Sequence, residues 1–107
     1  MATEKALERA ILFVEEFRKV DTEMPMQTAA ILLQVAKKPG MTMMDLSKAV
    51  GLGKSAVSRN VAKLSDEFGK GLLTFREDLM DRRNKVVHLT PEGERTLRTL
   101  LHYTGAE

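Results

Sequence analysis

The 107-residue chain has no cysteine and no tryptophan, and only 5% of its residues are aromatic. The absence of cysteine excludes disulfides, thiolate metal sites and thiol redox sensing. No apolar run approaches the roughly 18 residues that a membrane-spanning helix requires. The N-terminal segment is amphipathic and contains acids, unlike a signal peptide, so we expect a cytoplasmic protein with no membrane partner.

The remaining composition is that of an ordinary globular domain, with 43% hydrophobic and 30% charged residues. No repeat, low-complexity tract or interdomain linker is present, so residues 1–107 are predicted to form one domain with a modest core. The net charge is +2, but residues 1–24 hold four bases and six acids, which leaves +4 for the rest of the chain. A basic region of this kind suits nucleic acid, although a surplus of this size also arises by chance.

Residues 43–68 are predicted to form a helix-turn-helix. Two short helical patterns meet at Gly51-Leu52-Gly53, and a turn of this kind between short helices is typical of the motif. Gly69-Lys70-Gly71 is expected to end the second helix. Apolar residues recur at helical spacing on both sides of the turn: Leu46, Ala49 and Val50 before it, and Val57, Val61, Leu64 and Phe68 after it.

The opposite face of the second helix is small, polar and basic, and no carboxylate occurs from Gly51 to Ser65. A helix in the DNA major groove needs such a face, because bulk or negative charge would keep it off the phosphates. We expect Arg59 to pair with guanine and Lys54 to contact phosphate. The alternative is a solvated helix face with an incidental arginine. The full set of candidate DNA contacts on this helix is Lys54, Ser55, Ser58, Arg59 and Lys63.

Residues 3–20 are predicted to form a helix with Thr3 as its N-cap. The apolar residues of this helix cover two faces, which is more than one small domain needs. The excess favours a homodimer, and the alternative is a helix that is buried more deeply in its own core. The predicted dimer residues are Leu7, Ala10, Ile11, Val14 and Phe17.

The other predicted elements complete a winged helix. Two strands separated by a polar loop form a hairpin over residues 72–89, and Thr90-Pro91-Glu92 starts a helix over residues 91–104. Pro25 suits the first turn of the second helix, which Pro39-Gly40 ends. Met41-Thr42 can form a short strand, and Thr42 can also cap the helix that follows.

The predicted order is thus helix, helix, short strand, helix, helix, strand, strand, helix. This is a mainly α-helical fold with a small β-hairpin (α+β), a winged helix-turn-helix in which the hairpin tip reaches the DNA backbone or the minor groove.

The hairpin and the helix-turn-helix together resemble the MarR family. Residues 46–64, which include Val57-Ser58-Arg59-Asn60-Val61, are similar to the recognition motif of the family. The resemblance covers about residues 25–95, and it implies a homodimeric, cofactor-free transcriptional regulator of the repressor type. The wing pattern of the family is D-x-R-D-x-R, a strand, and L-T-x-x-G, and the matching residues are Asp78, Asp81, Arg83, Leu89, Thr90 and Gly93.

The wing departs from the family pattern at Met80, where the family usually has an arginine that enters the minor groove. Arg82, Arg83 and Lys85 are the remaining wing candidates. The family pattern implies that Arg83 pairs with Asp81, which favours Arg82 as the exposed DNA contact. Family effectors bind between the dimerisation and DNA-binding regions, and a short chain with one tyrosine offers little material for a small-molecule effector pocket.

Other patterns carry little chemistry. Gly53-Lys54-Ser55 matches the end of a phosphate-binding loop, but position 48 is Lys48 and no strand precedes the loop. His88 and His102 have no nearby partner for a metal, and no catalytic set can be assembled, so we expect neither a metal site nor an enzyme. The leading prediction is a homodimer on a pseudo-palindromic double-stranded DNA site. The alternative is a winged-helix protein-interaction, replication or architectural module.

Overall fold

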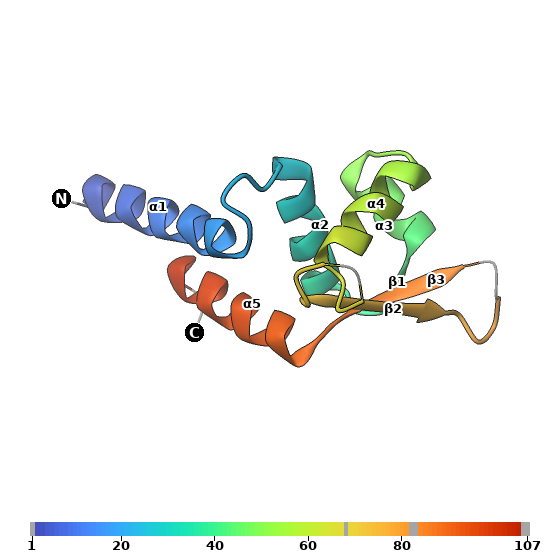
Figure 1. Cartoon of the computed structure of the whole chain (residues 1–107). Coiled ribbons are helices and arrows are strands. Elements are labelled where there is room, and N and C mark those ends of the chain that lie inside the picture. The colour runs from blue at the N-terminus through green and yellow to red at the C-terminus, as the bar shows by residue number, and fades with distance from the viewer. Residues whose placement is uncertain (1, 68, 82–83, 106–107) are drawn as a thin grey trace.

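The computed structural model describes residues 2–67, 69–81 and 84–105. Its elements follow the predicted order α1-α2-β1-α3-α4-β2-β3-α5 (Figure 1). The helices α1 and α5 lie at one end of a molecule 52 Å long, and α3, α4 and the β2–β3 hairpin lie at the other. The helices are α1 (Ala2–Val20), α2 (Met26–Lys37), α3 (Met43–Val50), α4 (Lys54–Leu64) and α5 (Pro91–Tyr103), and the strands are β1 (Met41–Thr42), β2 (Leu73–Glu77) and β3 (Lys85–Leu89).

The three strands form an antiparallel sheet in the order β1-β3-β2. Val87 lies at the centre of this sheet, opposite Met41 on one side and Phe75 on the other, and its side chain is fully buried. The predicted short strand therefore exists, and it joins the helix-turn-helix to the wing. Thr42 fills both roles foreseen for it, because its Oγ1 also accepts a hydrogen bond of 3.0 Å from the backbone N of Asp45 at the start of α3.

Every element contributes to a single apolar core. The three buried apolar residues of α4 lie at the predicted helical spacing, and α4 packs against α2 and α3. This arrangement holds α4 by one face and leaves the other free. The buried apolar residues are Phe17, Ile31, Leu32, Val35, Met41, Leu46, Val57, Val61, Leu64, Leu72, Leu73, Val87, Leu97 and Leu100.

The helix α4 ends at Leu64, earlier than the predicted end at residue 68, and Phe68 lies outside the described residues. The chain turns back after α4, so that Lys70 N donates to Lys63 O at 3.0 Å and Leu72 N donates to Leu64 O at 2.8 Å. These bonds satisfy carbonyl groups at the end of the helix, which have no partner within it. The returning backbone passes so close that a Cβ on Gly69 would lie 1.7 Å from Lys63 O.

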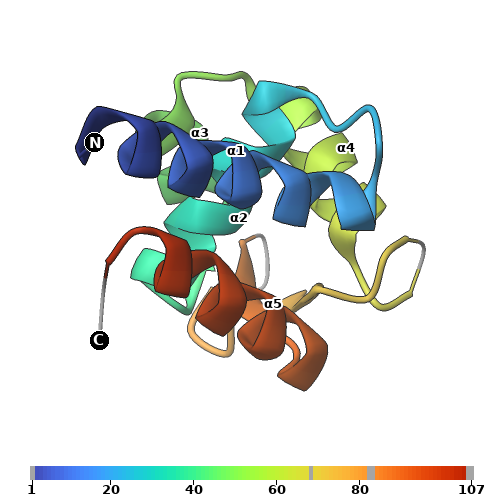
Figure 2. The same ribbon diagram turned by 90° about the vertical axis from the view of Figure 1, so that its left-hand side faces the viewer.

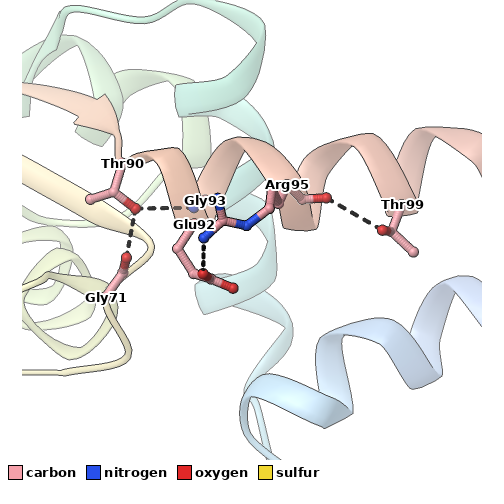
Figure 3. A network of polar contacts seen from close by, with 6 residues as sticks. All are labelled: Gly71, Thr90, Glu92, Gly93, Arg95 and Thr99. Carbon is pink, nitrogen blue, oxygen red and sulfur yellow. Dashed lines mark hydrogen bonds and ion pairs between the residues drawn. The ribbon is translucent and has the colours of Figure 1, made fainter.

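The starts of α1 and α5 differ in how well the sequence predicted them. The start of α1 is corrected, because the helix already begins at Ala2 and Thr3 therefore lies inside it. The start of α5 is as predicted: Thr90 Oγ1 accepts a hydrogen bond of 3.0 Å from Gly93 N, with proline in the first turn (Figure 3). The same hydroxyl donates to Gly71 O at 2.6 Å and so ties α5 to the loop that follows α4 (Figure 3).

Candidate nucleic-acid interface

The exposed side of α4 is the first part of the candidate interface. The five predicted contact residues of this helix are all exposed, while Val57, Val61 and Leu64 on the opposite side are at most 1% exposed. The helix thus presents three basic side chains and two hydroxyl groups to the exterior. Their roles in DNA contact stay a prediction. The residues are Lys54, Ser55, Ser58, Arg59 and Lys63.

A buried polar contact fixes α4 against α2. Asn60 is 4% exposed, and its Oδ1 accepts a hydrogen bond of 2.5 Å from the Oγ1 of Thr28, which is 3% exposed. Asn60 Nδ2 also donates to Ala56 O at 2.8 Å within α4. A buried amide needs such partners, so the pair joins the apolar residues of the same face in orienting α4 against α2. Sequence reasoning gave Asn60 no role, although its position on the apolar face, between Val57 and Leu64, was a signal.

The turn between α3 and α4 is held by its own hydrogen bonds. Gly51 ends α3 in the left-handed conformation, with φ of 70°, and its N donates to Ser47 O at 2.9 Å. Ser47 Oγ in turn donates to Leu52 O. Only glycine adopts this φ without strain, which explains the break in the helical pattern. Lys54 follows Gly53, the N-cap residue of α4, and so lies in the first turn of the recognition helix.

The β2–β3 hairpin is the second part of the candidate interface. Lys85 is exposed, and its Nζ lies 5.2 Å from the centroid of the Phe75 ring. The other two wing candidates, Arg82 and Arg83, lie outside the described residues, and so does the predicted pair of Arg83 with Asp81.

At the tip of the wing, Leu79 and Met80 are 97% and 93% exposed. Met80 was noted in the sequence as a departure from the family pattern, whereas Leu79 was given no role. The tip therefore presents two neighbouring apolar side chains.

The helix α1 divides its two apolar faces between the core and the exterior. Leu7, Ile11 and Val14 are 58%, 60% and 52% exposed, in keeping with a surface for a second chain. The prediction that Phe17 lies at the dimer surface is wrong. Its side chain is 6% exposed, and its ring packs edge-on against that of Phe13, with 5.3 Å between the ring centroids, within the same chain. The face of α1 that carries Phe17 is therefore buried in the core of its own chain, and a dimer contact through the exposed face stays a prediction.

The inner face of α1 lies beside α5 (Figure 2). Ala10, also predicted at the dimer surface, is exposed and lines a hollow between the two helices with Phe13 and Tyr103. Arg9 joins the same helices, because its guanidinium donates to Tyr103 O and His102 O, each at 3.2 Å. These contacts position α1 within its own chain.

Comparisons with known proteins agree with this arrangement. The model of the MarR family matches residues 22–84, more than half of the chain. The chain belongs to the MarR family. Transcriptional regulator HosA of Escherichia coli is 29% identical over 89 residues, which are 80% of this chain and 64% of HosA. The chain thus spans less than two thirds of this curated relative.

Solved structures of MarR-family members share the fold. MepR of S. aureus, crystallised with DNA, has a TM-score of 0.74 at 20% identity, over 98% of this chain and 80% of MepR. A crystal structure of MarR has a TM-score of 0.71 at 19% identity, over 97% of this chain and 73% of that one. At these identities the likeness establishes the fold. The predicted family and the predicted α+β winged helix-turn-helix are confirmed.

In this MarR-family chain a mainly apolar cavity of about 420 Å³ lies between α1 and α2. Its wall includes Phe13, Phe17 and Arg18, so this region holds more pocket-forming material than the sequence indicated. The guanidinium of Arg18 is already engaged, by Glu15 Oε1 at 2.8 Å and by Thr22 O at 3.1 Å. The cavity has the size of a small-molecule site, but its charged group is used within α1 and the link that follows it.

The part of the chain that the structure describes contains neither a candidate membrane-spanning helix nor a candidate metal site. No helix there has both the length and the apolar character needed to cross a membrane. The histidines and acids of the same residues form no cluster of three or more that could hold a metal ion. His88 lies half-buried in β3, and His102 lies on α5 against the ring of Tyr103.

Proposed function

We propose that this MarR-family protein binds a pseudo-palindromic double-stranded DNA site as a homodimer and regulates transcription as a repressor. One observation carries the proposal: α4 is buried along one side and exposes a basic, carboxylate-free side that includes Arg59. Such a helix can enter the major groove without electrostatic repulsion. The relative HosA is named a transcriptional regulator, which supports the same function.

The contacts divide into base readers and phosphate binders. Arg59 lies in the middle of α4 and is suited to a bidentate contact with guanine, while Ser55 and Ser58 can donate to or accept from base edges. Lys54 and Lys63, near the two ends of the helix, are placed for phosphate. On the wing, Lys85 is the exposed basic residue that the structure describes among the predicted contacts.

Dimerisation sets the spacing of the DNA site. Two chains joined through Leu7, Ile11 and Val14 would present two recognition helices to half-sites about one helical turn, or roughly 34 Å, apart. The proposed binding mechanism uses side chains of the protein alone and so requires no cofactor, metal or catalytic group, and a small-molecule effector stays doubtful. We place the protein in the cytoplasm, where a DNA-binding regulator acts. The protein-interaction alternative is not favoured, because the family and the fold both point to DNA-binding regulators.

The proposal is tested by selecting bound sequences from a random pool of DNA duplexes and measuring affinities for the selected site and for unrelated DNA. We expect a pseudo-palindrome. Arg59→Ala should reduce discrimination at one base of each half-site by about 1–3 kcal/mol. Lys54→Ala should weaken all DNA nearly equally and lower the salt slope by about one.

Arg98→Ala on α5 is the control, because Arg98 is exposed but lies outside both parts of the interface. Selection of no sequence above background at low salt would contradict the proposed function. If Arg59→Ala bound specific and unrelated DNA in the same ratio as the unaltered protein, base reading by Arg59 would be wrong while DNA binding would stand.

A further inference from the structure

The wing tip carries an apolar feature that neither the core nor the recognition helix explains. Leu79 and Met80 are 97% and 93% exposed, the highest values among the large apolar side chains of the described residues. In the strands of the same hairpin, Leu73 and Val87 are fully buried and Val86 is half-buried. The pair therefore contributes nothing to the core, and its exposure points to a partner outside the chain.

The turn is built so that these two side chains form its apex. Asp78 N donates to Asn84 O at 2.9 Å, and Asn84 N donates to Asp81 O at 3.0 Å, which closes the loop at its base. Both carboxylates accept hydrogen bonds within the loop: Asp78 Oδ1 from Met80 N at 3.0 Å, and Asp81 Oδ2 from Asn84 Nδ2 at 3.3 Å. These two aspartates are thus engaged within the loop, Glu77 at its base is exposed, and Leu79 and Met80 are presented outward.

The position of the tip indicates what it meets. The hairpin projects from the end of the molecule that carries α3 and α4, away from α1 (Figure 1). With α4 in the major groove, a wing beside it reaches the adjacent minor groove. Proteins that bind the minor groove frequently insert leucine or methionine between neighbouring bases, which unstacks them and bends the duplex.

We infer that Leu79 and Met80 form an apolar wedge that enters the minor groove beside each half-site and partly unstacks one base step. The inference rests on the proposed DNA binding and adds a second mode of sequence selection. Pyrimidine–purine steps such as TA and CA are the easiest to unstack, so the wing favours them at flanking positions that it does not read by hydrogen bonds.

The test uses the full chain and the duplex obtained from the random pool. The fluorescent base 2-aminopurine replaces an adenine at successive steps across the flanks, because its emission rises when it is unstacked. A donor and an acceptor dye on the duplex ends report bending. The unaltered protein should raise the emission at one flanking step on each side and shorten the distance between the ends.

Leu79→Ala/Met80→Ala should abolish the emission change and reduce the bend. It should also weaken binding to sites with flexible flanks by about tenfold, which is the effect of losing roughly 1.4 kcal/mol of apolar contact. Discrimination at the bases read by α4 should stay the same. Both side chains are exposed, so the variant should melt like the parent protein. Met26→Ala is the matched control, because Met26 is 88% exposed but lies at the start of α2.

A second variant separates apolar insertion from electrostatic attraction to the DNA phosphates. Met80→Arg introduces the arginine that is usual in the family at this position, so affinity for DNA should be retained or increased and should depend more steeply on salt. The change in 2-aminopurine emission should nevertheless become smaller.

Unchanged emission and bending in Leu79→Ala/Met80→Ala would overturn the wedge. A parent protein that binds its selected duplex without unstacking any flanking base would also overturn it, while the proposed function would stand. A shift of the double variant from dimer to monomer would assign the tip to a protein contact and overturn the inference. Failure to select any duplex would remove both the wedge and the proposed function.

Discussion

Asn60 is a buried polar side chain of α4 that is hydrogen-bonded to α2. It lies on the same side of α4 as Val57 and Leu64, yet it is polar and receives its hydrogen bond from Thr28, 32 residues earlier in the chain. Periodicity alone predicted correctly that Arg59 is exposed. It gave no role to Asn60, because the partner of a buried amide depends on how two helices pack, which local spacing does not encode.

Thr28→Val should lower the free energy of unfolding by about 1–3 kcal/mol, because Asn60 Oδ1 would stay buried without its donor. Thr28→Val/Asn60→Leu should cost less than the sum of the two single changes, since an apolar pair of similar shape leaves no unpaired group. Chemical denaturation measures all three values.

Ser58→Ala is the control for this prediction, because Ser58 is exposed on the same helix, and it should change stability by less than about 0.5 kcal/mol. A Thr28→Val protein as stable as the parent would show that water or another group satisfies Asn60. The hydrogen bond between Thr28 and Asn60 would then contribute nothing measurable to the free energy of unfolding.

Among the elements, the sequence predicted the caps of α3 and α5 better than it predicted the end of α4. Thr42 and Thr90 cap α3 and α5 as expected, since a cap depends on residues within one turn. The end of α4 was placed too late, because it depends on a loop that folds back and donates from Lys70 N to Lys63 O. A close approach between two stretches of backbone produces no periodic pattern in the sequence. Here the glycine at position 69 is the residue that indicates it.

Gly69→Ser tests this close approach. The new Cβ would lie 1.7 Å from Lys63 O, a backbone atom that cannot move without shifting the end of α4. We expect a loss of at least about 1–3 kcal/mol in the free energy of unfolding, the usual effect of overpacking. Thermal and chemical unfolding both report it.

Gly53→Ser makes the same substitution where nothing lies within 4 Å of the new Cβ. Serine is also a good N-cap for α4, so this variant should be as stable as the parent or slightly more stable. Equal stability of the two variants would mean that the loop after α4 relaxes freely, and that its contacts do not define where the helix ends.

For the whole molecule, the sequence predicted the family, the fold and the exposed basic side of α4, but only part of the opposite end, where α1 lies. The two motifs that indicate a winged helix are local, so they can be recognised without a structure. The apolar excess of α1 is ambiguous by nature, because burial in the core and burial in a dimer require the same residue types. The structure separates them by placing Phe17 in the core and leaving Ile11 60% exposed.

The exposed face of α1 is where we expect the second chain to bind. Ile11→Glu should convert the proposed dimer to a monomer, because it places a charge at the centre of an apolar surface that a second chain would bury. The monomer should keep its fold, since Ile11 contributes little to the core, and sedimentation of the free protein measures the change. Affinity for the full DNA site should fall by about 10²-fold or more, because the second half-site is no longer bound at high effective concentration.

Two further variants decide between interface and core. Phe17→Ala should lower the free energy of unfolding by about 3–5 kcal/mol, because it removes a buried ring. Ile11→Glu should have a melting temperature close to that of the parent protein, when both are measured at a concentration low enough for the parent to be monomeric. Gln27→Glu adds the same charge at an exposed site on α2 and should leave the dimer intact. A parent protein that sediments as a monomer at high concentration, yet binds both half-sites, would move dimerisation to the DNA. A dimeric Ile11→Glu protein would place the interface on another face.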